Sequence, residues 1–159
     1  LDFDAHHGDG TEEILADRPG VRFLSLFQWP LFPHRRMEPT PSNAVLSSLP
    51  AGAGGEDIRN VVENVWLPEI DKFQPDLMIL SAGFDAHCEE RIAQLKAGEM
   101  DYACVTRLLV EASFAYCEGR LVSVLEGGYE LRSLARSVFT HLQGLIRNPL
   151  PAETCKDPN

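Results

Sequence analysis

Two side chains that can bind a metal ion stand two residues apart near the start of the sequence, Asp4 and His6. In an extended strand, residues i and i+2 point to the same face, so this carboxylate and this imidazole project side by side. Oxygen and nitrogen donors arranged in this way are typical ligands of one divalent transition-metal ion. Asp2 lies on the same face one step earlier. The segment is therefore our first candidate for a metal site.

A third carboxylate and a phenol follow two apolar runs later in the chain. Asp85 comes five residues after the run 77–80, and Tyr129 comes four residues after the run 121–125. Ligands of parallel α/β sheets bind beyond the carboxyl ends of the strands, so both side chains are expected beside the first pair. Three protein ligands with an open fourth position are the catalytic pattern for zinc. The ion would polarise a carbonyl, and Tyr129 would donate a hydrogen bond to the oxyanion that develops during amide hydrolysis.

Short strand-like runs alternate with longer helical patterns along the chain. Strand formers fill residues 21–27, 77–80 and 121–125, and the last two runs are continuous enough to indicate strands buried in the interior. The prolines between residues 30 and 41 predict a loop. This alternation predicts an α/β domain with a mainly parallel sheet.

Three stretches show apolar residues at helical spacing: 58–70, 105–116 and 131–145. Pro68 is expected to kink or interrupt the first helix near its end. We assign the apolar stripes of these helices to the core, and we place His141, on the last helix, at the surface. The tail from residue 148 is expected to fray.

The charge balance excludes some classes of partner. With 24 acidic and 14 basic residues, the formal net charge is 14 − 24 = −10, which opposes direct binding to nucleic acid or to anionic membranes. A cationic substrate, such as an acylated lysine tail or a polyamine, would meet a favourable field. The four cysteines form no C-x-x-C pair, and we interpret them as reduced thiols of a cytoplasmic protein.

Three motifs, in this order, resemble the zinc-dependent histone deacetylase family, which also includes acetylpolyamine amidohydrolases and acetoin-utilisation proteins. They are Asp-Phe-Asp-Ala-His-His-Gly-Asp-Gly-Thr at 2–11, Ser-Ala-Gly-Phe-Asp-Ala-His at 81–87 and Leu-Glu-Gly-Gly-Tyr at 125–129. The similarity is closest to the bacterial class II-like members and extends to about residue 145. It implies an arginase/deacetylase-type three-layer α/β fold of which the N-terminal part is missing. Residues 1–147 would then be the C-terminal part of a deacetylase catalytic domain.

The resemblance also implies roles for single residues. Asp4, His6 and Asp85 match the zinc ligands of the family, and Tyr129 matches its catalytic tyrosine. The paired catalytic histidines of the family would lie upstream of this chain. His6 is not one of them, because its sequence context is that of the metal motif.

Further residues match the surroundings of that centre. Asp2 matches a carboxylate that orients one active-site histidine and touches a bound potassium ion, and Asp9 matches the carboxylate behind the second histidine. Ser25 and Leu26, the latter through its backbone carbonyl, match the rest of the potassium site together with the carbonyls of Asp4 and His6. His87 and Cys88, close to Asp85 in sequence, are assigned to a supporting shell or to the rim.

The sequence therefore predicts part of a zinc-dependent enzyme that removes acyl groups from lysine side chains or related amines. Ferrous iron suits the same His and carboxylate set.

An arginase-like dimanganese hydrolase is an alternative, although it needs a further aspartate where this chain has His87. A calcium loop is disfavoured because His7 stands where an EF-hand needs glycine. A third hypothesis is a non-catalytic fragment with uncovered apolar surface, because no histidine remains as an obvious general base. Oligomeric state and acyl group are left open.

Overall fold

The computed structural model describes residues 1–35 and 38–146, so the predicted tail at 148–159 lies outside the described residues. The three predicted strands and three predicted helices are present, with boundaries shifted by a few residues. In chain order the elements are α1 (Asp9–Leu15), β1 (Phe23–Gln28), β2 (Ala44–Leu49), α2 (Gly55–Val61), the π-helical η1 (Val62–Trp66), α3 (Leu67–Phe73), β3 (Met78–Ala82), α4 (Glu99–Tyr116), β4 (Leu121–Leu125) and α5 (Leu131–Leu145).

The first residues of the chain join two strand pairs into one parallel sheet. β1 pairs with β2 and β3 pairs with β4, each in parallel register. Asp2 forms parallel bridges to both Ser25 on β1 and Ser81 on β3. Its amide donates to the carbonyl of Leu24 at 2.9 Å, and the amide of Phe3 donates to the carbonyl of Ser81 at 3.1 Å. The strand order is thus β2, β1, residues 1–3, β3, β4, which confirms the predicted parallel α/β class.

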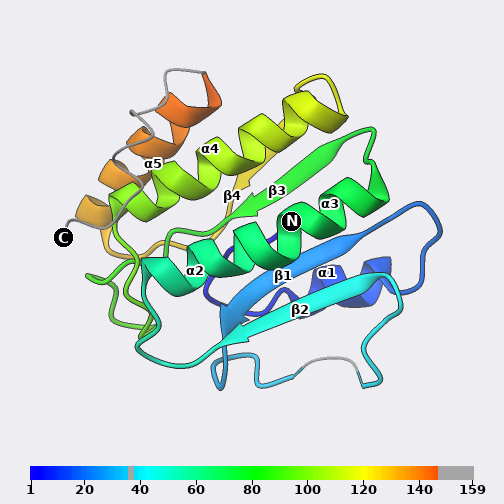
Figure 1. Cartoon of the computed structure of the whole chain (residues 1–159). Coiled ribbons are helices and arrows are strands. Elements are labelled where there is room, and N and C mark those ends of the chain that lie inside the picture. Colours follow the sequence, from blue (N-terminus) through cyan, green and yellow to red (C-terminus); the bar gives the residue numbers. More distant parts are fainter. Residues whose placement is uncertain (36–37, 147–159) are drawn as a thin grey trace.

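Helices cover one face of this sheet more fully than the other. Figure 1 shows α2 to α5 in front of the strands and α1 behind them. Met78 and Leu80 of β3 point to the helical side and are buried, whereas Ile79 between them is 55% exposed. Val122 and Val124 of β4 are about half exposed as well. The prediction that these two strands are buried in the interior is therefore wrong for one face, because little chain packs on it within the described ranges.

Pro68 interrupts the helix at 58–70 as expected, although the interruption is a change of helix type. The π-helical turn η1 ends immediately before α3, and the amide of Leu67 bonds to the carbonyl of Val62, five residues back. Pro68 stands in the first turn of α3, directly after this change of helix type, and has no N–H to donate. Trp66 closes η1 and is fully buried in the core.

The last helix buries a face that the sequence pattern did not predict. Leu131 and Leu142, assigned to the core, are 75% and 51% exposed, and α5 instead buries a row of small and polar side chains: Ser133, Ser137, His141 and Gly144. Small side chains allow α5 to approach α4 closely, and hydrogen bonds cross the contact, while Leu134 and Val138 of the predicted stripe pack against the core. His141 is 3% exposed, so the prediction of a surface histidine is wrong.

The cysteines divide into two groups. Cys88 and Cys117 are free thiols, whereas Cys104 is disulfide-bonded, so the prediction of four reduced thiols is wrong for Cys104. Cys155 lies outside the described residues. A cytoplasmic location, which rested on reduced thiols, stays a prediction.

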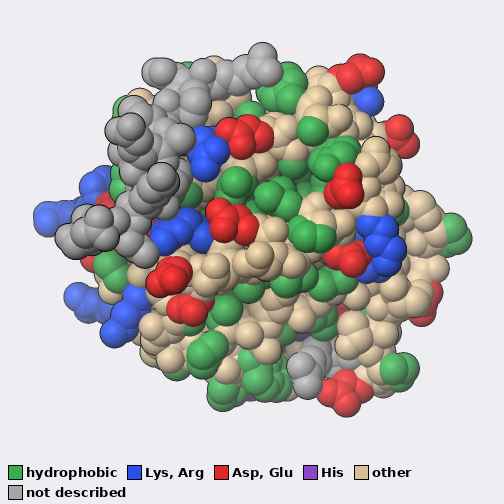
Figure 2. Space-filling view, in the orientation of Figure 1, with side chains coloured by type: hydrophobic (Ala, Val, Ile, Leu, Met, Phe, Trp, Pro, Cys, Tyr) green, Lys and Arg blue, Asp and Glu red, His purple; other side chains and the backbone are tan. Residues whose placement is uncertain are grey.

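The surface matches the mixed but acidic composition. On the helical face, acidic and basic side chains are interspersed among apolar ones (Figure 2). Over the described ranges, no helix combines the length and apolar character needed to cross a bilayer.

Candidate metal centre

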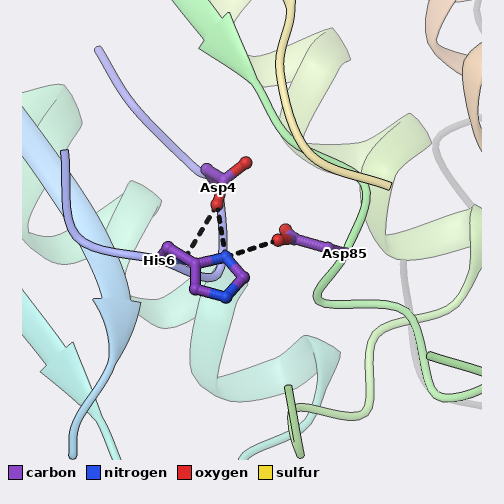
Figure 3. A group of neighbouring side chains, drawn as sticks. All are labelled: Asp4, His6 and Asp85. Carbon is purple, nitrogen blue, oxygen red and sulfur yellow. Dashed lines mark hydrogen bonds and ion pairs between the residues drawn. The ribbon is translucent and has the colours of Figure 1, made fainter. Parts of the chain in front are cut away.

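Asp4, His6 and Asp85 converge at one edge of the sheet, as the strand-end argument predicts (Figure 3). Nδ1 of His6 lies 2.7 Å from Oδ2 of Asp85 and 3.1 Å from Oδ1 of Asp4. One donor atom from each residue can be chosen so that all three lie within 4.8 Å of one another. This spacing fits donors that share one cation.

Each carboxylate is fixed by the backbone that surrounds it. Oδ1 of Asp85, three residues after β3, accepts a hydrogen bond from the amide of Ala5 at 2.8 Å. Oδ1 of Asp4 accepts from the amide of His6 at 2.8 Å, and its Oδ2 accepts from the amide of Gly127 at 2.7 Å. The loops after residues 1–3, β3 and β4 are thus tied together through the candidate ligands themselves.

Two glycines let the backbone come close enough for this arrangement. A Cβ atom on Gly127 would lie 2.5 Å from Oδ2 of Asp4 and 2.6 Å from Oδ2 of Asp85. A Cβ on Gly83 would lie 2.2 Å from Oδ2 of Asp4. Neither glycine offers a ligand atom, so neither was among the candidate site residues of the sequence analysis. The available signal was one glycine directly after β3 and another two residues after β4.

The cluster favours a positive charge between its two carboxylates. Hydrogen bonds that the His6 ring donates to the carboxylates of Asp4 and Asp85 raise the pKa of His6 to about 10, against the opposing effect of burial. Burial raises the pKa of Asp85. Burial alone would raise the pKa of Asp4 as well. Hydrogen bonds donated by His6 and by the amide of Gly127 outweigh burial, so the pKa of Asp4 is lowered. An imidazolium proton or a divalent cation can supply this positive charge.

An open cavity of about 500 Å³ lies over the cluster, with Tyr129 and Phe32 in its lining. The ring centroids of Tyr129 and Phe32 lie 6.4 Å and 6.5 Å from that of His6, both in edge-to-face geometry. The Tyr129 side chain is 57% exposed, and burial together with nearby acidic groups raises its phenol pKa. Sequence reasoning missed Phe32, for which the only signal is an aromatic residue inside a proline-rich loop.

The residues matched to a potassium site lie beside this cluster. Asp2 is 4% exposed, and its Oδ1 accepts a hydrogen bond from the amide of Asp4 at 3.1 Å. Burial raises the pKa of Asp2 to about 7. Ser25 is fully buried on β1, and its hydroxyl has no hydrogen-bond partner within the part of the chain that the structure describes. The amide of the next residue, Leu26, donates to the carbonyl of Asp2 at 3.0 Å. Asp9 lies farther along, as the first residue of α1.

The four other histidines do not join the cluster. His7 pairs with Glu12 at 2.8 Å in the interior, and His34 lies exposed on the proline-rich loop. His87 is buried, accepts a hydrogen bond from the amide of Glu89 and lies outside the three-ligand group. His141 bonds to Thr106 and Ser123 between α4, α5 and β4.

Comparison with known proteins finds similarity to deacetylases along most of this chain. The histone deacetylase domain model matches residues 1–145. A probable deacetylase of Archaeoglobus fulgidus is 37% identical over 82% of this chain and 38% of its own length. The polyamine deacetylase HDAC10 of Mus musculus is 33% identical over 95% of this chain and 24% of its own length. The structure of the histone deacetylase Clr3 superposes with a TM-score of 0.82 at 29% identity, covering 99% of this chain and 28% of that one. The chain thus spans well under half the length of these relatives.

Proposed function

Because this chain belongs to the histone deacetylase family, we propose that it carries the metal centre of an amide hydrolase that removes acyl groups from lysine side chains or from small amines such as polyamines. The single observation that supports this most strongly is the convergence of Asp4, His6 and Asp85 from two distant segments. Family membership suggests a metal cofactor, and these residues fit one.

Asp4, His6 and Asp85 would hold a zinc ion, or ferrous iron, with one ligand atom each. The support is their donor chemistry, their mutual spacing and the absence of any side chain at Gly127, where a Cβ would crowd both carboxylates. When bound, such an ion polarises the substrate carbonyl and lowers the pKa of water.

The remaining steps belong to the chain itself. The raised pKa keeps the phenol of Tyr129 protonated, so it can donate a hydrogen bond to the oxyanion that develops on the attacked carbonyl. Phe32 and Tyr129 both line the cavity with their rings edge-to-face to that of His6, and they would contact the alkyl stem of the acylated amine.

The general base is not supplied by this chain in our proposal. Three of the other histidines are buried in other contacts, and His34 is exposed on the proline-rich loop, so paired histidines outside these residues would take the proton from water. Asp2 and Asp9 would orient that pair. We therefore expect the 159-residue chain alone to bind metal without hydrolysing amides.

A potassium ion would bind next to the zinc site. Asp2, the hydroxyl of Ser25 and the backbone carbonyls of Asp4, His6 and Leu26 are the proposed ligands. The support is that the Ser25 hydroxyl is buried without a partner among the described residues, beside a buried carboxylate. An oxygen-only set of this kind suits a hard cation.

The substrate would be an acylated amine that carries positive charges near its neutral amide. The net charge of −10 favours an amine over an anionic partner such as nucleic acid. One similar protein is named a polyamine deacetylase, and others are named histone deacetylases, so both amine classes are candidates. A cytoplasmic location remains part of the proposal.

Zinc binding to the purified chain tests the proposal. We expect one zinc ion per chain by calorimetry and elemental analysis, because the three donors share one cation. Two manganese ions per chain would favour the dimanganese alternative instead.

Asp85→Ala should lose stoichiometric zinc, and Asp85→Asn, which keeps an acceptor for the amide of Ala5, should weaken zinc binding without unfolding. Asp76→Ala, at an exposed aspartate just before β3, is the matched control and should bind like the wild type. Stoichiometric zinc in Asp85→Ala would refute the ligand assignment.

A further inference from the structure

We propose that Glu90 is a positioning residue for Tyr129, an inference that rests on the proposed function of that tyrosine. Oε1 of Glu90 accepts hydrogen bonds from two successive backbone amides, those of Tyr129 at 2.7 Å and Glu130 at 2.8 Å. Hydrogen bonds to a charged acceptor are stronger than neutral ones. One carboxylate oxygen thus holds the backbone on which the phenol stands.

The tyrosine loop needs such an anchor because little else restrains it. Two glycines precede Tyr129, and Gly128 has φ of +142°, a conformation that side chains rarely adopt. The Tyr129 side chain is 57% exposed and therefore lacks tight packing. At the other end of the loop, the amide of Gly127 donates to Asp4, and the carbonyl of Gly127 accepts from the amide of Phe84 at 2.7 Å. Glu90 and Asp4 thus hold the loop from opposite ends.

The position of Glu90 also suits the start of α5. Amides at a helix N-terminus carry partial positive charge, yet the first turn of α5 contains no acidic residue. Glu90 brings a carboxylate to this end from another segment, while the cap residue Glu130 bonds to the amide of Ser133. Glu90 follows the proposed ligand Asp85 by five residues on the same loop. Its hydrogen bonds therefore connect the loop of a metal ligand to the loop that carries Tyr129.

Glu89 offers a matched control next to Glu90. It has the same side chain on the same loop, but it pairs with Arg136 at 2.5 Å, and among the described residues its carboxylate makes no hydrogen bond to residues 127–130. Removing Glu89 takes a similar charge from the same region, so it separates a general electrostatic effect from anchoring.

Amide hydrogen exchange of the intact chain tests the anchor without any metal. In Glu90→Ala we expect the amides of Tyr129 and Glu130 to exchange at least about tenfold faster, while α4 and the sheet keep their protection. Glu90→Gln, which keeps an acceptor oxygen, should restore most of the protection, and Glu89→Ala should leave these amides unchanged. Unchanged exchange at both amides in Glu90→Ala would overturn the proposal.

Binding of acetohydroxamate to the zinc-loaded chain tests whether the anchor acts through Tyr129. Tyr129→Phe and Glu90→Ala should each weaken the probe by about tenfold, and the double variant should be no weaker than Tyr129→Phe alone. If the losses of acetohydroxamate affinity in Tyr129→Phe and Glu90→Ala add up in the double variant, the positioning role is overturned. It is also overturned if Glu89→Ala loses as much affinity as Glu90→Ala. If the chain binds no zinc, the proposed function fails, and amide exchange still decides whether Glu90 anchors the loop.

Discussion

At the scale of single residues, the site depends on how closely the backbone approaches two carboxylates. Gly127 donates its amide to Asp4 and leaves no room for a Cβ beside Asp4 and Asp85. The ligand geometry is therefore set partly by a residue that offers no ligand atom. The missing side chain at Gly127 is therefore as necessary for the geometry as the two carboxylates themselves.

Gly127→Ala is predicted to weaken zinc binding by at least about tenfold, because the added methyl group must displace one of the carboxylates. Calorimetric titration of the variant checks this. Gly10→Ala is the control, since a Cβ at Gly10 meets nothing within 4 Å, and it should bind zinc like the wild type. Wild-type affinity in Gly127→Ala would show that the site tolerates a wider spacing.

The three candidate ligands could be predicted from residue type and from their position at strand ends. Asp4 and His6 share a face by strand geometry alone, and Asp85 joins them because parallel strands end at one edge. The contribution of Glu90 could not be predicted in this way. Its contacts depend on the path of a loop that has no periodic pattern.

At the scale of elements, α5 is held by a buried hydrogen-bond chain. Nδ1 of His141 lies 2.6 Å from the hydroxyl of Thr106, which itself donates to the carbonyl of Tyr102. Nδ1 is therefore the donor, and Nε2 accepts from Ser123 at 2.8 Å. A neutral imidazole satisfies every bond in this chain, and burial lowers the His141 pKa to about 4.

This burial makes stability depend on pH. The folded state binds the His141 proton only near pH 4, whereas the unfolded state binds it below about pH 6.5, so stability is fully present above pH 6.5 and falls as the pH drops toward 4. We predict that His141 lowers the free energy of unfolding by about 2 kcal/mol between pH 7 and pH 5.

Urea unfolding at both pH values, compared between the wild type and His141→Gln, isolates this contribution. The variant should lose that part of the pH dependence, although it is less stable at pH 7. Equal pH dependence in both proteins would mean that the folded state binds the His141 proton as readily as the unfolded state does. The comparison cancels the opposite effect of Asp2, whose pKa is raised by burial.

The elements differ in how well the sequence predicts them. β1, β3, β4 and α4 follow from strand formers or helical spacing. β2 was not predicted, because Ser47 and Ser48 interrupt its apolar pattern next to a long proline-rich loop. The buried face of α5 was predicted only in part: Leu134 and Val138 of the apolar stripe pack against the core, but the fully buried residues form a row of small and polar side chains that periodicity does not identify.

At the scale of the whole molecule, the first residues of the chain hold the sheet together. Residues 1–3 lie between β1 and β3, so the segment that delivers Asp4 and His6 is also the central connection of the sheet. The parallel order could be predicted from the alternation of elements. The open face beside β3 and β4 could not, because an apolar run alone does not say what packs against it.

Anomalous X-ray scattering at the zinc edge, from crystals of the zinc-loaded chain, tests the central claim most directly. The account predicts one strong zinc peak, with oxygen or nitrogen atoms of Asp4, His6 and Asp85 each at about 2.0–2.2 Å. A zinc peak at other residues, or an Asp85 carboxylate turned away from the ion, would contradict the account.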